Sequence, residues 1–190
     1  MARERKFTTD DLYQATEEIL LKHSYDGFNF SLLAERLQVS RGAIYKYFDN
    51  KDVLITEYML YEMNKFLTGL EAIETVGGFK EQLHFLIDHM FKNPAIQQLI
   101  ELGKHVPTHK DKKVQENKRK LEKLHLDMYH SLKNFIQLGR REQVLKQSIP
   151  DSLVLGYIFQ SVVIPNHFEV PHSEWVNSIK EIISHGIYNE

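Results

Sequence analysis

The sequence predicts an all-α protein, with an N-terminal module of three short helices followed by a C-terminal helical bundle. Nearly every periodic segment has apolar residues three and four positions apart, the repeat of an amphipathic helix. No stretch alternates apolar and polar residues between hairpin turn signals, as a strand would. The first three helical segments are also joined by tight, capped turns, which is typical of a helix-turn-helix arrangement.

The composition limits the classes of protein to consider. With 42% hydrophobic and 11% aromatic residues, the 190-residue chain can build a real core. It contains no cysteine, which excludes disulfides, thiolate nucleophiles and cysteine-based zinc sites. The N-terminus is charged rather than signal-like, and no apolar run approaches the ~18 residues of a membrane span. We therefore expect a soluble, cytoplasmic protein with no membrane partner.

The first helix is expected to begin at Thr8, whose hydroxyl and the Asp11 carboxylate can form a capping box. The segment SYDGFN (24–29) ends this helix, with Gly27 as the turn residue. Asn29 is a good cap for a second helix. The buried face of that helix has the spacing i, i+3, i+4 and i+7 and consists of Phe30, Leu33, Ala34 and Leu37.

The third helix is expected over RGAIYKYF (41–48), after the turn QVS and with Ser40 as its cap. Ile44 and Phe48, four residues apart, hold one side to the core. Gly42 costs ~1 kcal/mol of helix propensity relative to Ala, which suggests that something approaches this turn closely. The other side offers donors to a DNA major groove, whose base edges and phosphates are mostly acceptors. These donors are Ser40, Arg41, Tyr45, Lys46 and Tyr47.

The overall charge of −2 does not indicate a nucleic-acid partner, but its distribution is uneven. Between residues 36 and 51 only Asp49 is acidic, whereas four residues are basic, an excess of three. A DNA-binding hypothesis must therefore rest on local geometry rather than on a general basic field. The four basic residues are Arg36, Arg41, Lys46 and Lys51.

Further helices are expected throughout the chain after the N-terminal module. A helix apolar on nearly every side, such as the one after IPDS (149–152), has to be covered on every side. In a chain of this size, that covering indicates a partner subunit. The helices are expected from about 51 to 74, after TVGG (75–78) with Phe79, Leu83, Leu86, Ile87 and Met90 on it, from Pro94 with Asn93 as cap, from about 111 to 138, after 149–152, and from about Ser173 onward.

The stretch SLLAERLQVSRGAIYKYFDNKDVL (31–54) resembles the signature of the TetR family of bacterial transcriptional regulators. The resemblance is close over about 50 N-terminal residues, and elsewhere it extends only to helical layout and length. It implies a helix-turn-helix DNA-binding domain at 1–50 and a helical effector-binding and dimerisation domain at 51–190. It further implies a homodimer that binds a near-palindromic, double-stranded operator.

The resemblance implies DNA contacts at the positions of this chain that match the family's motif. Arg41, Gly42, Ala43 and Lys46 would face bases, with Ser40 beside them as the cap. Tyr45, Tyr47 and Lys51 would mainly hold phosphates, with help from Asn29 and Ser31. The chain departs from the family at Gln38, where Gly is common because the turn favours a positive φ, and at Leu32, where a polar residue is usual.

The bundle is expected to hold a small, largely apolar effector that releases a repressor from its operator. The effector itself remains unidentified. Residues that could line a pocket, although each fits plain core better than a ligand contact, are Tyr58, Met63, Phe85, Met90, Tyr129 and Phe159. Two alternatives stay open: an activator or regulator of the same fold controlled by a protein partner, and a helical binding module without DNA function.

Other chemistry finds little support in the sequence. There are ten histidines, but they lack ligand spacing, so neither a metal site nor any cofactor is expected. No phosphate loop, nucleophile elbow or paired-carboxylate motif indicates an enzyme. The lysine-rich segment 110–123 could contact DNA phosphates or an anionic ligand, but it fits better the solvated start of a long helix.

Overall fold

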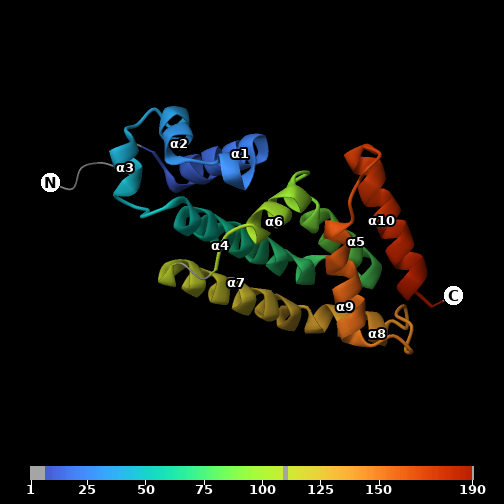
Figure 1. Cartoon of the computed structure of the whole chain (residues 1–190). Coiled ribbons are helices and arrows are strands. Elements are labelled where there is room, and N and C mark those ends of the chain that lie inside the picture. Colours follow the sequence, from blue (N-terminus) through green and yellow to red (C-terminus); the bar gives the residue numbers. More distant parts are fainter. Residues whose placement is uncertain (1–6, 109–110, 190) are drawn as a thin grey trace. The chain divides into compact units, whose positions relative to one another are not determined.

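A computed structural model describes residues 7–108 and 111–189 and confirms the all-α fold class (Figure 1). Two short 3-10 helices and one isolated β-bridge, between Leu145 and Tyr188, accompany the α-helices in these ranges. The helices are α1 (Thr9–Gly27), α2 (Phe30–Arg36), α3 (Arg41–Tyr45), α4 (Lys51–Leu70), α5 (Phe79–Met90), α6 (Ile96–Lys104), α7 (Lys112–Ser131), α8 (Lys133–Arg141), α9 (Asp151–Gln160) and α10 (His172–Ile187).

The chain divides into two compact units, each assembled from two stretches of sequence. Unit 1 comprises the described parts of 1–63 and 98–122, so α6 and the first half of α7 pack with the N-terminal helices. Unit 2 comprises 64–97 and the described part of 123–190. The domain boundary predicted at residue 50 divides the chain by function, DNA binding before it and effector binding after it. It does not coincide with the division into the two compact units and stays a prediction.

The core of unit 1 is built from the apolar stripes of its helices. Leu33 of α2, Ile44 of α3 and Leu54 of α4 are completely buried, and Val114 of α7 joins them. Burying one such side chain stabilises the fold by about 1.5–3 kcal/mol. Leu32, at the position where the sequence departs from the family, packs partly buried against this core. Of the stripe that the sequence predicts for α2, Phe30, Leu33 and Ala34 are confirmed as buried, whereas Leu37 is half-buried just after the helix.

The core of unit 2 is centred on α5, which packs on α8 and α10. The ring of Phe79 stacks on that of Phe135 in α8, with 4.7 Å between their centroids. A Cβ at Gly139 would come within 2.6 Å of the Phe79 ring, so this close approach requires glycine. Among the described residues, no helix has both the length and the apolar character needed to cross a membrane.

The predicted caps of the first two helices are confirmed. The Thr8 N–H donates to Asp11 Oδ2 at 2.9 Å and the Asp11 N–H donates to Thr8 Oγ1 at 3.0 Å, which completes the capping box and lowers the pKa of Asp11. Asn29 Oδ1 accepts from the N–H groups of Ser31 and Leu32. Ser40 occupies the cap position of α3, but its side chain makes no capping hydrogen bond, so that part of the prediction is wrong.

Three predicted boundaries after the N-terminal helices are wrong. The helix expected over 111–138 is interrupted at Leu132, where the Met128 carbonyl accepts both the Ser131 hydroxyl at 2.8 Å and the Leu132 N–H at 3.3 Å. The helix expected to reach residue 74 ends at Leu70 and tightens into a 3-10 turn, Glu71–Thr75. Asn93 accepts from the Ala95 N–H at 2.9 Å, but α6 begins later, at Ile96.

Gln38 lies in the left-handed region, with φ = 54°, at the turn where the sequence predicts a positive φ. This conformation costs a residue with a Cβ about 1–2 kcal/mol, whereas glycine adopts it freely. Ser24 near the end of α1 also has a positive φ, 59°.

We expect Gln38→Gly to raise the free energy of unfolding by about 0.5–1 kcal/mol, because relief of strain exceeds the extra entropy of glycine in the unfolded chain. Urea denaturation measures the change. Gln14→Gly on the exposed face of α1 is the control and should destabilise by about 1 kcal/mol. A loss of stability in Gln38→Gly would contradict the proposed strain.

Candidate nucleic-acid interface

The orientation of α3 is set by the turn before it and by two buried side chains. The Val39 N–H donates to the Ala34 carbonyl at 2.9 Å, which closes the turn after α2. Ile44 and Phe48 are both buried in the core of unit 1. α3 ends at Tyr45, earlier than expected, so Lys46 and Tyr47 lie in the turn that follows it. The opposite side of α3 is therefore held outward.

The outward side carries the residues predicted to contact DNA. Arg41, Gly42 and Lys46 are exposed, and Ala43 is half-buried. Neither the Arg41 guanidinium nor the Lys46 ammonium has a hydrogen-bond or ion-pair partner in the ranges that the structure describes. Both groups are thus available to an external acceptor.

Gly42 is not required by the packing of the chain itself. A Cβ added there would meet only Ser40 Oγ, at an ordinary 4.0 Å. Its missing side chain leaves the first turn of α3 open to solvent, which fits the close external approach that the sequence suggests.

Two tyrosines flank this surface and are half exposed. The Tyr45 ring packs edge-on against Phe30, with centroids 4.9 Å apart, and Tyr47 packs edge-on against Phe7 at 6.1 Å. Each ring is thus anchored on one side while part of the residue stays in solvent. This is a suitable arrangement for a hydroxyl that donates to a phosphate.

The residues predicted to contact phosphates at the starts of α2 and α4 differ in whether they already form hydrogen bonds within the chain. Ser31 is exposed, whereas the Asn29 oxygen already accepts the two α2 N–H groups. The Lys51 ammonium donates to the Tyr25 carbonyl at 2.8 Å and lies 4.1 Å from the centre of the Tyr25 ring. The Tyr25 hydroxyl donates to Asp52 at 2.7 Å, and burial together with this carboxylate raises its pKa. Lys51 therefore also joins α1 to α4, a role that the sequence did not reveal.

Arg36 does not contribute a free cation to the basic excess. Its guanidinium donates to both carboxylate oxygens of Glu18, at 2.6 and 3.1 Å, and lowers the pKa of that carboxyl. Among the described residues, the free positive charges of α2, α3 and the turn after α3 are consequently those of Arg41 and Lys46.

A second bridge, also missed in the sequence, lies directly after α3. Asn50 Oδ1 accepts from the Val53 N–H and so caps α4, while its Nδ2 donates to Asp111 at 2.8 Å. Asp111 in turn accepts from the N–H groups of Lys113 and Val114 at the start of α7. These donors lower the pKa of Asp111. We call this contact the Asn50–Asp111 bridge.

A buried polar pair follows along the same two helices. Asn117 Nδ2 donates to Thr56 Oγ1 at 3.0 Å, and the two residues are 1% and 0% exposed. The Thr56 hydroxyl itself donates to the Asp52 carbonyl at 2.8 Å. Both helices are therefore joined by a hydrogen bond that water does not reach.

We expect Thr56→Val to lower the free energy of unfolding by about 1–3 kcal/mol, because the isosteric change leaves the Asn117 amide buried without its acceptor. Urea denaturation measures the loss. Adding Asn117→Leu to this variant should recover most of it, since no unsatisfied group then remains. Equal stability of Thr56→Val and the unmodified chain would contradict a role for the pair.

Comparison with known proteins now identifies the module. Residues 12–58 match the family described as bacterial regulatory proteins, tetR family. The helix-turn-helix module of the chain is that of the TetR family, a non-enzymatic family of DNA-binding transcriptional regulators, and the recognition made from residues 31–54 is confirmed. This excludes a helical module without DNA function.

Solved structures of TetR-family and other transcriptional regulators share the fold over the whole chain. The ketosteroid transcriptional regulator KstR2 of Mycobacterium tuberculosis is 12% identical, with coverage of 100% of this chain and 98% of that one and a TM-score of 0.72. The fatty acid degradation regulator FadR of Bacillus halodurans is 16% identical, and the match covers 98% of each chain with a TM-score of 0.71. FadR of Bacillus subtilis, solved with stearoyl-CoA, is 20% identical. The match covers 95% of this chain and 100% of that one, with a TM-score of 0.71. No curated protein sequence matches this TetR-family chain.

The residues predicted to line an effector pocket fall in both units of this TetR-family protein. Tyr58 is buried in unit 1, where its hydroxyl donates to Glu17 at 3.0 Å, and Met63 is half-buried at the end of that unit. In unit 2, Tyr129 and Phe159 pack together with centroids 5.2 Å apart. The other two residues in unit 2 are Phe85, which stacks on His89, and Met90, which is buried.

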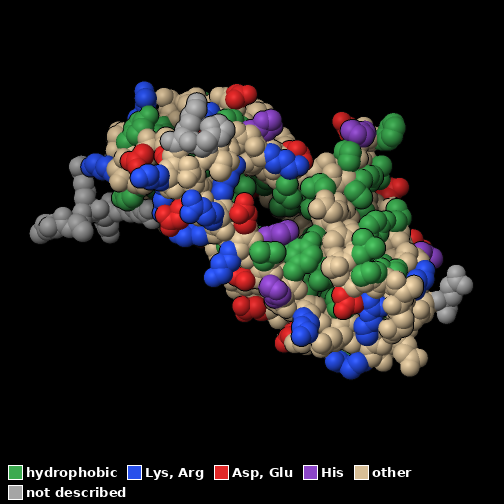
Figure 2. Space-filling view, turned by 60° about the horizontal axis from the view of Figure 1, so that its bottom comes forward, with side chains coloured by type: hydrophobic (Ala, Val, Ile, Leu, Met, Phe, Trp, Pro, Cys, Tyr) green, Lys and Arg blue, Asp and Glu red, His purple; other side chains and the backbone are tan. Residues whose placement is uncertain are grey.

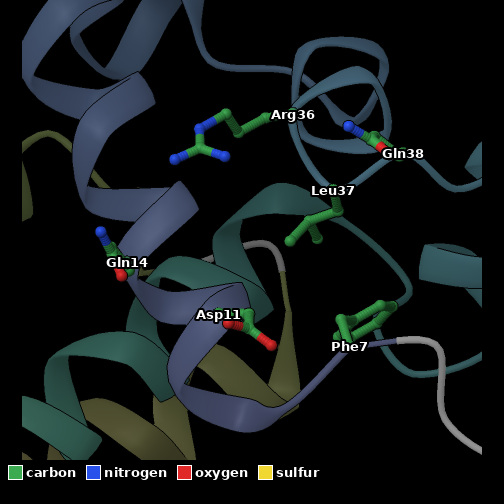
Figure 3. A pocket seen from close by; sticks show the side chains of 6 residues that line it. All are labelled: Phe7, Asp11, Gln14, Arg36, Leu37 and Gln38. Carbon is green, nitrogen blue, oxygen red and sulfur yellow. The ribbon is translucent and has the colours of Figure 1, made fainter.

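A pocket of about 200 Å³ lies at a different place in this TetR-family chain, between the start of α1 and the turn after α2 (Figure 3). Its walls are polar, and the Arg36 side chain over it is held by Glu18. None of the six predicted effector residues lines it. The residues that do are Phe7, Asp11, Gln14, Arg36, Leu37 and Gln38.

Proposed function

We propose that this TetR-family regulator is a homodimeric repressor that binds a near-palindromic operator through α3 and is released by a small, largely apolar effector. Residues 1–50 read the DNA, and residues 51–190 bind the effector and form the dimer. The observation that carries the proposal is the outward side of α3 and of the turn after it. There Arg41 and Lys46 are exposed and have no partner among the described residues, while Ile44 on the inner side is fully buried.

Each predicted contact has a role set by its chemistry. Arg41 reads guanine through a bidentate pair of hydrogen bonds, and Lys46 reads a neighbouring acceptor. Gly42 and Ala43 let the helix approach the base edges, and Ser40 lies at its tip. The remaining contacts bind phosphates and so position the helix on the DNA. They are Asn29, Ser31, Tyr45, Tyr47 and Lys51.

An uncovered apolar surface on α9 and α10 supports the homodimer. One side of α9 is buried in unit 2, but Leu153 and Tyr157, four residues apart on its other side, are 59% and 48% exposed. Ile182 of α10 is also 59% exposed, and a Cβ at Gly156 or Gly186 would meet nothing. Figure 2 shows hydrophobic side chains gathered on the part of the molecule that carries these helices. A second copy covers such a surface with self-complementary contacts.

Release follows from differential binding of the effector. An effector that fits the bundle better when the two α3 helices are wrongly spaced for successive major grooves shifts the dimer to that state. Typical couplings of this kind amount to about 1–3 kcal/mol. The same fold holds stearoyl-CoA in FadR of Bacillus subtilis, which supports an apolar effector. An activator, or control by a protein partner, is the alternative.

Selection of duplexes from a random library tests the proposal. We expect the purified protein to enrich one near-palindromic sequence and to bind it as a dimer, with affinity that falls steeply as salt rises. Long-chain acyl-CoA added to that complex is expected to release the DNA. Enrichment of no sequence would overturn the proposed DNA reading, and release only by a protein partner would replace the effector.

A further inference from the structure

We infer that the start of α7 is a second phosphate contact of this regulator, centred on Lys112, so that its DNA contact surface extends beyond the helix-turn-helix. The inference rests on the proposed reading of DNA by α3 and names a further part of the same interface. It concerns only unit 1, to which α3, the start of α4 and residues 111–122 all belong.

The first half of α7 buries one side and exposes cations on the others. Val114 and Asn117 are buried against unit 1. Lys112 is exposed and has no hydrogen-bond or ion-pair partner in the described ranges, and Lys113 lies 3.8 Å from Glu57, a long ion pair on a half-exposed side chain. The cations further along are partly engaged, since Lys120 pairs with Glu116 at 2.7 Å and Lys118 donates to the Val106 carbonyl at 2.6 Å.

The Asn50–Asp111 bridge fixes this helix start at the exit of the recognition helix. Asn50 immediately precedes Lys51, a predicted phosphate contact, and Asp111 immediately precedes Lys112. The buried Thr56–Asn117 hydrogen bond holds the two helices together one to two turns further on. Figure 1 shows α4 and α7 starting at the same end of this unit, the end at which α3 lies. Lys112 is therefore presented beside the surface that faces the DNA.

The charge balance of the helix-turn-helix gives this contact a function. Arg36 is neutralised by Glu18 and Lys51 is engaged with Tyr25, which leaves Arg41 and Lys46 as the unengaged cations of α2, α3 and the following turn. Neutralisation of phosphates supplies essentially all non-specific affinity and a large share of specific affinity. Arg41 and Lys46 are the unengaged cations of these elements among the described residues, and Lys112 adds another beside them without carrying sequence information.

The Asp111 carboxylate is held in the bridge and forms no ion pair with Lys112 in the described ranges. One of its oxygens accepts from Asn50 and the other from the N–H groups of Lys113 and Val114. These neutral donors hold the ionised carboxylate in the bridge, whereas the Lys112 side chain is exposed to solvent. The capping function thus uses the Asp111 carboxylate within the bridge, and the proposed phosphate contact uses the exposed side chain of Lys112.

Lys112→Gln tests the inference, with Lys123→Gln as the matched control. Both residues are exposed lysines without partners in the described ranges, and they lie three turns apart on α7, about 16 Å. Both variants carry the same change in charge. The affinity of each for a duplex of random sequence and for the duplex that the unmodified protein selects is measured across a salt series.

We expect Lys112→Gln to weaken binding to both duplexes by the same factor. The plot of log affinity against log salt should become flatter by about 0.9 for each phosphate that is no longer neutralised, or about 1.8 in a dimer. The ratio of specific to non-specific affinity should not change. Lys123→Gln should leave the slope unchanged. Equal slopes for Lys112→Gln and Lys123→Gln would overturn the second contact while leaving the reading by α3 intact.

Failure of the proposed function has a different signature. If the unmodified protein binds selected and random duplexes with the same affinity, α3 does not read sequence, and the inference about Lys112 is overturned with it. A change in the affinity ratio caused by Lys112→Gln would also overturn the inference, because it would make Lys112 a base contact.

Discussion

Replacing Ile182 by Asp is expected to convert the regulator from a dimer to a monomer. Ile182 lies on the exposed apolar surface of α9 and α10 that we propose a second copy covers. An unpaired charge buried at such an interface costs about 3–5 kcal/mol, so the dissociation constant should rise by more than about 100-fold. Light scattering after size-exclusion chromatography, repeated over a concentration series, measures this change.

Leu126→Asp is the matched control for this experiment. Leu126 of α7 is a branched aliphatic residue with the same 59% exposure as Ile182, but it lies outside α9 and α10. We expect Leu126→Asp to remain dimeric and Ile182→Asp to lose operator affinity together with dimerisation, because a monomer engages only one half-site. Identical masses for the two variants would contradict the assignment of the dimer surface to α9 and α10.

Arg41→Ala is expected to lower operator affinity by about 10- to 100-fold, since a bidentate contact to guanine contributes about 1–3 kcal/mol of discrimination. Affinity for random DNA should fall much less, because one cation of the half-site is removed but no base contact exists there. Fluorescence anisotropy with labelled duplexes measures both affinities. Selectivity should therefore fall with operator affinity.

Arg36→Ala is the control for Arg41. The two arginines are five positions apart and both exposed, but the Arg36 guanidinium is paired with Glu18. An exposed pair of this kind contributes about 0–1 kcal/mol to stability, so the fold should persist. We expect Arg36→Ala to keep its selectivity for the operator. Equal loss of selectivity in the two variants would show that general charge, rather than a base contact, accounts for the effect of Arg41.

The parts of the fold that the sequence predicted are those set by neighbours along the chain. The Thr8–Asp11 capping box and the Asn29 cap each involve residues two or three positions apart. The buried side of α2 and the positive φ of Gln38 likewise follow from local spacing and turn chemistry. Such features are visible in one short window of sequence.

The parts that were missed depend on residues far apart in the sequence. Lys51 bonds to Tyr25, and Asn50 bonds to Asp111 across 61 positions. No periodicity reports such pairs, so Lys51 was interpreted only as a phosphate contact and the lysine-rich segment at 110–123 as a solvated surface. The structure describes the part of that segment from Asp111 onward and places its residues up to 122 in unit 1 with α3.

In α9 the apolar pattern of the sequence is explained only in part by packing within one chain. The sequence of α9 is apolar on nearly every side, and the prediction was that it must be covered on every side. Within one chain only the side with Val154, Leu155 and Ile158 is covered. The remaining side, with Leu153 and Tyr157, is the surface on which we base the dimer.

The central claim, that α3 reads base sequence through Arg41, is tested most directly by a cycle that combines one protein change with base-pair changes in the operator. Each base pair of the selected half-site is substituted in turn, and affinity is measured for the unmodified protein and for Arg41→Ala. We predict one G·C pair whose substitution weakens the unmodified protein by about 10- to 100-fold but leaves Arg41→Ala unaffected. The same penalty in both proteins at every base pair would contradict the claim.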